Sequence, residues 1–174
     1  MDYTVAMQRA IALAEKGLGK TAPNPIVGAV IIDSSGAIVA EGFHDRNKSK
    51  DHAEIVAIKA AGEKSKGSAI VVTLEPCNHT GNTGPCVQAI IDAGITTVVF
   101  AVNDPNEKAA GGAAALRAAG INVVDGVLKD EAEFSNRAWL MKIRKNRPFF
   151  TWKVAATLDG KVAAADGTSK WITN

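Results

Sequence analysis

The near-continuous apolar run at residues 69–74 restricts the fold of this chain more than any other segment. A strand without alternating polar residues is typical of one that is buried on both faces of a sheet. After this run, helical and extended patterns alternate. They predict the following elements: helix 85–93, strand 96–102, helix 112–119, strand 121–124 and helix 130–141. Alternation of this kind indicates parallel strands whose connecting helices cover both faces of the sheet.

The segment before this run predicts an antiparallel addition to the sheet. Apolar residues recur at intervals of three and four within 2–17, which indicates an amphipathic helix. Two apolar stretches, 26–32 and 37–42, are joined by a turn at 33–36, so we expect a hairpin, and a further helix follows at 52–61. The sequence therefore predicts one α/β domain of three layers, α/β/α, around a mixed central sheet.

The composition limits the possible partners. Of the 174 residues, 47% are hydrophobic, which is enough for one buried core. The net charge is only +2 and no long run of one sign occurs, so the basic surface of a nucleic-acid-binding protein is not expected. No apolar segment approaches the ~20 residues that span a bilayer, and the first residues lack a secretory signal. We expect a cytoplasmic protein that binds a small molecule and neither nucleic acid nor membrane.

Three residues suited to zinc stand at the starts of predicted helices or the end of a predicted strand. His52 opens one helix, Cys77 follows the buried strand, and Cys86 begins the next helix, where the helix dipole favours its thiolate form. Imidazole and thiolate are preferred zinc ligands, and three protein ligands leave a fourth position open, as in catalytic sites. We predict one Zn²⁺ per chain at this place.

Glu54 is the predicted catalytic residue. It lies two positions after His52, where it can exchange protons with a water molecule without binding the metal. The order His-x-Glu followed by Pro-Cys-x-x-Cys is typical of zinc-dependent nucleobase deaminases. The first half matches, but eight residues, 78–85, separate Cys77 from Cys86 where the pattern has two. The sequence therefore indicates a deaminase with an enlarged loop between its cysteines.

Other interpretations of these residues remain open at this point. The cysteines could be ordinary buried thiols, or they could form a structural zinc site with His79 as the fourth ligand, although only one residue separates His79 from Cys77. Glu54 could be an ordinary solvated helix residue. A zinc deaminase acting on another nucleobase, a nucleoside or tRNA adenosine, and a zinc-stabilised module without turnover, are the competing functions.

Longer motifs resemble those of one family. The segments are His52-Ala53-Glu54, Thr73-Leu74-Glu75-Pro76-Cys77-Asn78-His79-Thr80-Gly81, Gly84-Pro85-Cys86 and Asp104-Pro105-Asn106. They resemble the deaminase half of the bifunctional riboflavin-biosynthesis deaminase-reductases, including the long spacing between the cysteines. The resemblance implies a cytidine deaminase-like fold. It also implies hydrolysis of diaminohydroxyphosphoribosylaminopyrimidine to the corresponding aminouracil, with release of ammonia.

The same resemblance implies a set of substrate-binding residues. They fall on Asn24, His44, Asp104 and Asn106, and we add His79 and Asn82 from the loop between the cysteines as further candidate contacts. At Asn82 the family usually has lysine or arginine after the loop glycine, so this chain lacks a cation there for a phosphorylated substrate.

The resemblance also divides the chain. We expect a deaminase domain over 1–146, while 147–174 resembles the opening of the family's reductase half. That segment is too short to bury a core, so we expect no reductase activity from this polypeptide and assign NADPH only to the missing part. Its apolar residues should be disordered, pack on the domain or pair with a neighbouring subunit, and we expect a homo-oligomer.

Overall fold

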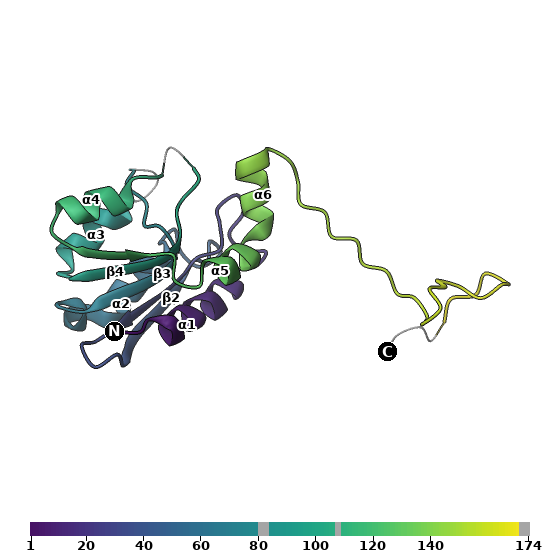
Figure 1. The fold of residues 1–174 in the computed structure, drawn as a ribbon, viewed down its shortest axis with the longest axis horizontal. Helices are drawn as coiled ribbons and strands as arrows, with labels where there is room; N and C mark the ends of the chain where they lie inside the picture. The colour runs from purple at the N-terminus through teal and green to yellow at the C-terminus, as the bar shows by residue number, and fades with distance from the viewer. Residues whose placement is uncertain (80–83, 107–108, 171–174) are drawn as a thin grey trace.

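A computed structural model describes residues 1–79, 84–106 and 109–170, and it contains one mixed sheet of five strands in the order β2-β1-β3-β4-β5 (Figure 1). The strands are β1 Gly28–Ile32, β2 Ile38–Phe43, β3 Ala69–Leu74, β4 Thr97–Val102 and β5 Asn122–Asp125. β1 pairs antiparallel with both β2 and β3, whereas β3, β4 and β5 run parallel. This arrangement confirms the mixed sheet and the hairpin that the sequence predicts.

Helices cover both faces of this sheet. They are α1 Thr4–Glu15, α2 Ala53–Ala61, α3 Cys86–Asp92, α4 Gly112–Ala118, α5 Lys129–Ser135 and α6 Arg137–Lys145, with a short 3₁₀ helix at Gly62–Ser65. α2, α3 and α4 pack on one face, where Ile70, Val72 and Phe100 are fully buried. α1 and α5 pack on the other, against Val71 and Val99. Successive residues of β3 therefore face opposite helix layers, which explains why its sequence is apolar throughout.

The C-terminal helical segment differs from its prediction. The sequence predicts a single helix over 130–141, but the structure has two helices, with Asn136 between them. The buried side-chain amide of Asn136 donates a hydrogen bond to the carbonyl oxygen of Ile26, at 3.2 Å. This long-range contact fixes the start of α6 against the beginning of the sheet. The spacing of apolar residues along the sequence cannot predict such a contact, so it does not predict the break in the helix.

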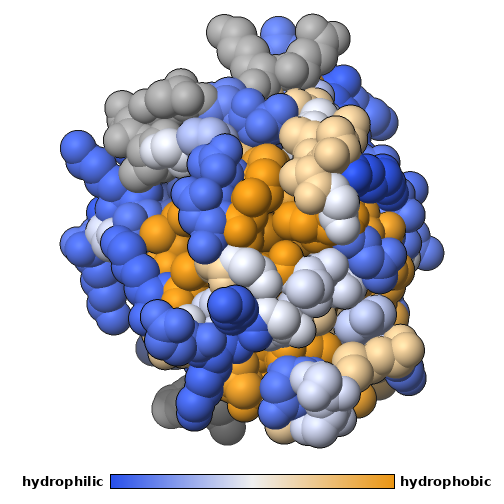
Figure 2. All heavy atoms as spheres, turned by 90° about the vertical axis from the view of Figure 1, so that its left-hand side faces the viewer, coloured by the Kyte–Doolittle hydropathy of each residue, from blue (hydrophilic) through white to orange (hydrophobic). Residues whose placement is uncertain are grey.

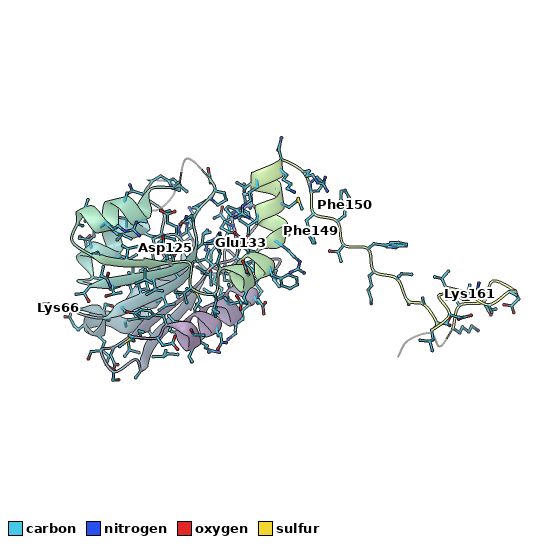
Figure 3. All side chains as sticks on the ribbon, in the orientation of Figure 1. Lys66, Asp125, Glu133, Phe149, Phe150 and Lys161 are labelled. Carbon is cyan, nitrogen blue, oxygen red and sulfur yellow. The ribbon has the colours of Figure 1, made fainter. Side chains whose placement is uncertain are left out.

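Beyond α6 the chain extends away from the sheet, with Phe150 and Trp152 exposed (Figure 3). The domain boundary that we expect at 146 stays a prediction. Hydrophobic residues also gather near the centre of the face that lies at the left of Figure 1, with hydrophilic residues around them (Figure 2). The homo-oligomer that we expect from the sequence also stays a prediction. Within the described ranges, no helix has the length and hydropathy needed to cross a bilayer.

Gly42 in β2 allows α2 to approach the sheet closely. A Cβ atom at this position would overlap with the carbonyl oxygen of Ala53 and would lie 2.7 Å from the backbone nitrogen of Ala57. Both obstacles are backbone atoms, so no side-chain rotation can relieve the overlap. The contact matters for function because the first turn of α2 carries Glu54 and follows directly after His52.

We expect Gly42→Ala to lower the free energy of unfolding by about 1–3 kcal/mol, because α2 must move away from β2. Urea denaturation followed by circular dichroism measures this change. Gly84→Ala is the control, because a Cβ there meets nothing within 4 Å and its φ is ordinary. Equal effects of the two substitutions would contradict the proposed close approach.

Candidate metal centre and active site

The three predicted metal ligands meet at one edge of the sheet. His52 precedes α2, Cys77 follows β3, and Cys86 is the first residue of α3. His52 Nδ1 lies 3.3 Å from Cys86 Sγ and 3.6 Å from Cys77 Sγ. All three atoms lie within 4.8 Å of one another, and both cysteines are free and buried. The carboxyl ends of strands and the starts of helices converge here, as in ligand sites of other open α/β sheets.

This cluster has the dimensions of a zinc site. Tetrahedral zinc, with Zn–N near ~2.0 Å and Zn–S near ~2.3 Å, places neighbouring ligand atoms roughly 3.5–3.8 Å apart. The two measured nitrogen–sulfur distances are close to this spacing. In the described part of the chain, the cluster of metal-compatible side chains comprises these three residues and does not include His79. The geometry therefore gives no support to a fourth protein ligand from His79.

The two sulfur atoms influence each other's protonation. A hydrogen bond from Cys86 lowers the pKa of Cys77 to about 4, and His52 adds to this effect. The same hydrogen bond, together with burial, raises the pKa of Cys86 far above its ordinary value. Adjacent buried thiolates repel each other, so a divalent cation held by His52, Cys77 and Cys86 would balance the second negative charge and would allow both cysteines to bind as thiolates.

Glu54 lies beside the cluster in the first turn of α2 and lines the cleft in front of it. Its carboxyl group is buried, and this burial is the main cause of its raised pKa. A raised pKa makes the protonated form of a carboxyl group easier to reach, so the group can donate a proton as well as accept one. The position and the environment of Glu54 thus suit general acid–base chemistry.

The cleft has a volume of about 520 Å³, which is in the usual range for small-molecule sites. Five of the predicted substrate-binding residues line it: Asn24, His44, His79, Asp104 and Asn106. Asn82 lies outside the described residues. His52, Glu54 and Cys77 also line the cleft, whereas Cys86 is fully buried behind it. The structure brings together residues from the β1–β2 side and from the end of β4 around the metal cluster.

His44 is held in one tautomer by its neighbours. Its Nδ1 lies 2.8 Å from the carbonyl oxygen of Asp51, which only accepts hydrogen bonds, so Nδ1 carries the proton. Nε2 is then an acceptor for the side-chain amide of Asn24, at 3.4 Å. Burial lowers the pKa of His44, which keeps the ring neutral. Asn24 and His44 therefore form an oriented polar pair at one side of the cleft.

Asp104 provides the polar group at the other side. Its Oδ1 accepts a hydrogen bond from the backbone nitrogen of Asn106, at 2.8 Å, which closes the turn after β4. Burial is the largest cause of the raised pKa of Asp104, and the nearby carboxylate of Glu75 adds to it.

Glu75 is a structural residue of the site whose contacts the sequence does not reveal. Its two carboxylate oxygens accept hydrogen bonds from the backbone nitrogens of Asp104, at 3.1 Å, and Ala113, at 2.9 Å. It thereby joins the end of β3 to the turn after β4 and to the start of α4. A glutamate directly after a buried strand is the only sequence signal for this role.

Several residues that line the cleft were not predicted from the sequence, and four of them come from the β2–α2 loop and from α6. Arg46 and Lys50 come from the loop between β2 and α2, and Trp139 and Ile143 come from α6. The first two could have been considered because they lie between His44 and His52. Trp139 and Ile143 carry no such signal, because α6 reaches the cleft only through the fold.

The sequence comparisons agree with this geometry. Residues 2–102 match the cytidine and deoxycytidylate deaminase zinc-binding region. The chain belongs to this family. It is 49% identical to riboflavin biosynthesis protein RibD of Mycobacterium tuberculosis, over 97% of this chain and 50% of the relative. The corresponding values for RibD of Escherichia coli are 47%, 97% and 46%. The chain thus spans about half the length of the curated relatives it matches.

Solved structures show the same fold. A diaminohydroxyphosphoribosylaminopyrimidine deaminase/5-amino-6-(5-phosphoribosylamino)uracil reductase from Thermotoga maritima superposes with a TM-score of 0.92 at 46% identity, covering 99% of this chain and 50% of that one. RibD of Acinetobacter baumannii gives a TM-score of 0.86 at 44% identity, covering 98% and 48%. The expected cytidine deaminase-like fold and the zinc-binding character of the domain are confirmed.

We expect the purified chain to bind one zinc ion, and His52→Ala and Cys86→Ala to lose most of it, because each removes one of three ligands. Metal analysis after gel filtration measures the zinc content. His44→Ala is the control, because it removes a neighbouring imidazole that is not part of the cluster. Full zinc content in Cys86→Ala would show that the metal is bound elsewhere.

Proposed function

We propose that this chain catalyses the hydrolytic deamination of diaminohydroxyphosphoribosylaminopyrimidine in riboflavin biosynthesis. The observation that carries the proposal is the His52–Cys77–Cys86 cluster with Glu54 beside it in a cleft of suitable size. The substrate assignment is supported by the near 50% identity to RibD proteins and by the activity named for the Thermotoga maritima neighbour.

In this proposal, His52 Nδ1 and the two Sγ atoms of Cys77 and Cys86 hold the metal. A zinc ion with three protein ligands supplies Lewis-acid activation of water at neutral pH. Glu54 takes one proton from the attacking water and passes it to the ring nitrogen next to the reacting carbon. It then takes the hydroxyl proton of the adduct and delivers it to the exocyclic nitrogen. The carbon–nitrogen bond then breaks, a carbonyl group forms on the ring, and ammonia leaves as a neutral molecule.

The polar residues on the two sides of the cleft orient the substrate. The Asn24–His44 pair offers amide and imidazole groups in fixed positions, since His44 is held by the carbonyl oxygen of Asp51. Asp104 and Asn106 approach from the end of β4. We assign hydrogen bonds to the pyrimidine or ribose to these residues, with His79 as a further contact at the cleft wall.

We further propose that the catalytic domain comprises residues 1–146 and that 147–174 belongs to a second domain. α6 ends at Lys145, and the exposed aromatic residues after it lack a core of their own within the described residues. The alignment to the relatives, which are about twice as long, includes this segment.

Zinc-dependent ammonia release tests the proposed activity directly. The zinc-loaded chain should release ammonia from diaminohydroxyphosphoribosylaminopyrimidine much faster than from cytidine or guanine. Release from cytidine or guanine alone would identify a different deaminase, and no release from any of the three would contradict the enzymatic proposal.

We expect Glu54→Gln to lower kcat by about 10²–10⁴-fold, because the amide cannot transfer the proton. Its zinc content and unfolding midpoint should stay close to those of the unchanged chain. Glu63→Gln, an exposed position in the 3₁₀ helix, is the matched control and should retain full turnover. Unchanged turnover in Glu54→Gln would mean that another group moves the proton.

A further inference from the structure

The loop between β2 and α2 contributes positive charge to the cleft. Arg46 and Lys50 both line it, together with His52 and Glu54. Among the described residues that line the cleft, Arg46 is the only arginine and Lys50 is the only lysine, and both are exposed. A neutral pyrimidine ring does not require two cations, so these residues need a separate explanation.

Neither cation is neutralised by a carboxylate in the described part of the chain. The ion pairs found there are Arg9–Glu41, Lys59–Asp51, Arg117–Asp125 and Arg144–Glu133. The loop that carries Arg46 and Lys50 contains two aspartates. Asp51 is already paired with Lys59. Asp45 is buried and accepts a hydrogen bond from the backbone nitrogen of Asn47, at 3.1 Å. The positive charges of Arg46 and Lys50 remain available to a ligand.

The acidic residues of the cleft have other contacts. Glu75 accepts two backbone hydrogen bonds, and Asp104 accepts one from Asn106. Glu54 is buried beside the metal cluster. The loop side of the cleft is thus its cationic side.

Arg46 is held in place at the rim of the cleft. Its Nη1 donates a hydrogen bond to the carbonyl oxygen of Ala22, at 2.8 Å, and its backbone nitrogen donates to the carbonyl oxygen of Lys20, at 3.3 Å. These bonds fix the guanidinium group next to the segment that carries Asn24. The remaining N–H groups of the planar guanidinium can bind an oxyanion.

Arg46 also lies close to the substrate-orienting pair. The pKa of His44 is lowered mainly by burial, and the positive charge of Arg46 is a further cause. Both Arg46 and His44 line the cleft, so the guanidinium group faces the same space as the Asn24–His44 pair. Lys50, two positions before His52, lines the same cleft and carries its charge on a flexible side chain.

We propose that Arg46 and Lys50 form a phosphate subsite that binds the phosphomonoester end of the substrate. This inference rests on the proposed deaminase function for the identity of the substrate. A phosphomonoester carries a charge of about −1.5 to −2 at pH 7, which the two cations match. Phosphate bound at the rim would hold the ribosyl chain and direct the heterocycle towards Glu54.

Ribose 5-phosphate tests the subsite without turnover. Isothermal titration calorimetry of the zinc-loaded chain should detect its binding. Arg46→Ala and Lys50→Ala should each weaken the binding about tenfold, because each removes one charge-assisted contact. Lys48→Ala is the matched control, since this exposed lysine is in the same loop but does not line the cleft. Inorganic phosphate should compete, and ribose should not.

Absence of ribose 5-phosphate binding to the unchanged chain would overturn the subsite, as would equal losses in Lys48→Ala and Arg46→Ala. Either result concerns the subsite alone, because the proposed deaminase function is tested separately by ammonia release. If ammonia is not released from any substrate but ribose 5-phosphate binds as described, the subsite is supported and the proposed reaction is wrong.

Kinetics with two substrates separates binding of phosphate from a general loss of activity. For the phosphorylated pyrimidine, Arg46→Ala and Lys50→Ala should raise KM about tenfold each and leave kcat within about twofold. For the dephosphorylated analogue, both constants should stay as in the unchanged chain. An equal rise in KM for both substrates would contradict a phosphate-specific role.

Discussion

Burial of β3 on both faces is the constraint on which the rest of the structure depends. All six of its residues are buried, and it pairs with β1 on one side and β4 on the other. Because helices pack on both of its faces, the strand cannot shift its register without disrupting side-chain packing in both layers and its hydrogen bonds to β1 and β4. Cys77 lies three residues after the end of β3, so the core fixes its position. The geometry of the metal cluster depends on this fixed position.

Backbone hydrogen bonds extend this order to the loop that follows. The backbone nitrogen of Val87 donates to the carbonyl oxygen of Cys77, at 3.3 Å, and that of Asn78 donates to the carbonyl oxygen of Ala109, at 3.2 Å. At Gly112, a Cβ atom would overlap with the carbonyl oxygen of Pro76, so glycine allows α4 to pack directly on the loop. Glu75 joins the same parts through its side chain. The ligands thus stand on a rigid frame, as accurate metal sites require.

The sequence predicts those features that depend on local patterns. The alternation of helical and extended patterns after residue 69 is sufficient to predict the layers of the fold. The spacing of His52, Glu54 and the cysteines is sufficient to predict the metal cluster. Features that depend on distant contacts are not predictable in this way. Asn136 interrupts a helical pattern because its amide reaches Ile26, and α6 lines the cleft only after the chain has folded back.

The placement of the two sulfur atoms also determines how oxidants can reach them. Cys86 is fully buried, while Cys77 is 8% exposed and lines the cleft. A peroxide molecule that attacks Cys77 therefore approaches through the cleft. A ligand in the cleft would block access to this sulfur. A metal bound to both thiolates would engage their lone pairs and so reduce their reactivity towards oxidants. We therefore expect any molecule bound in the cleft to slow the oxidation of Cys77 to the sulfenic acid.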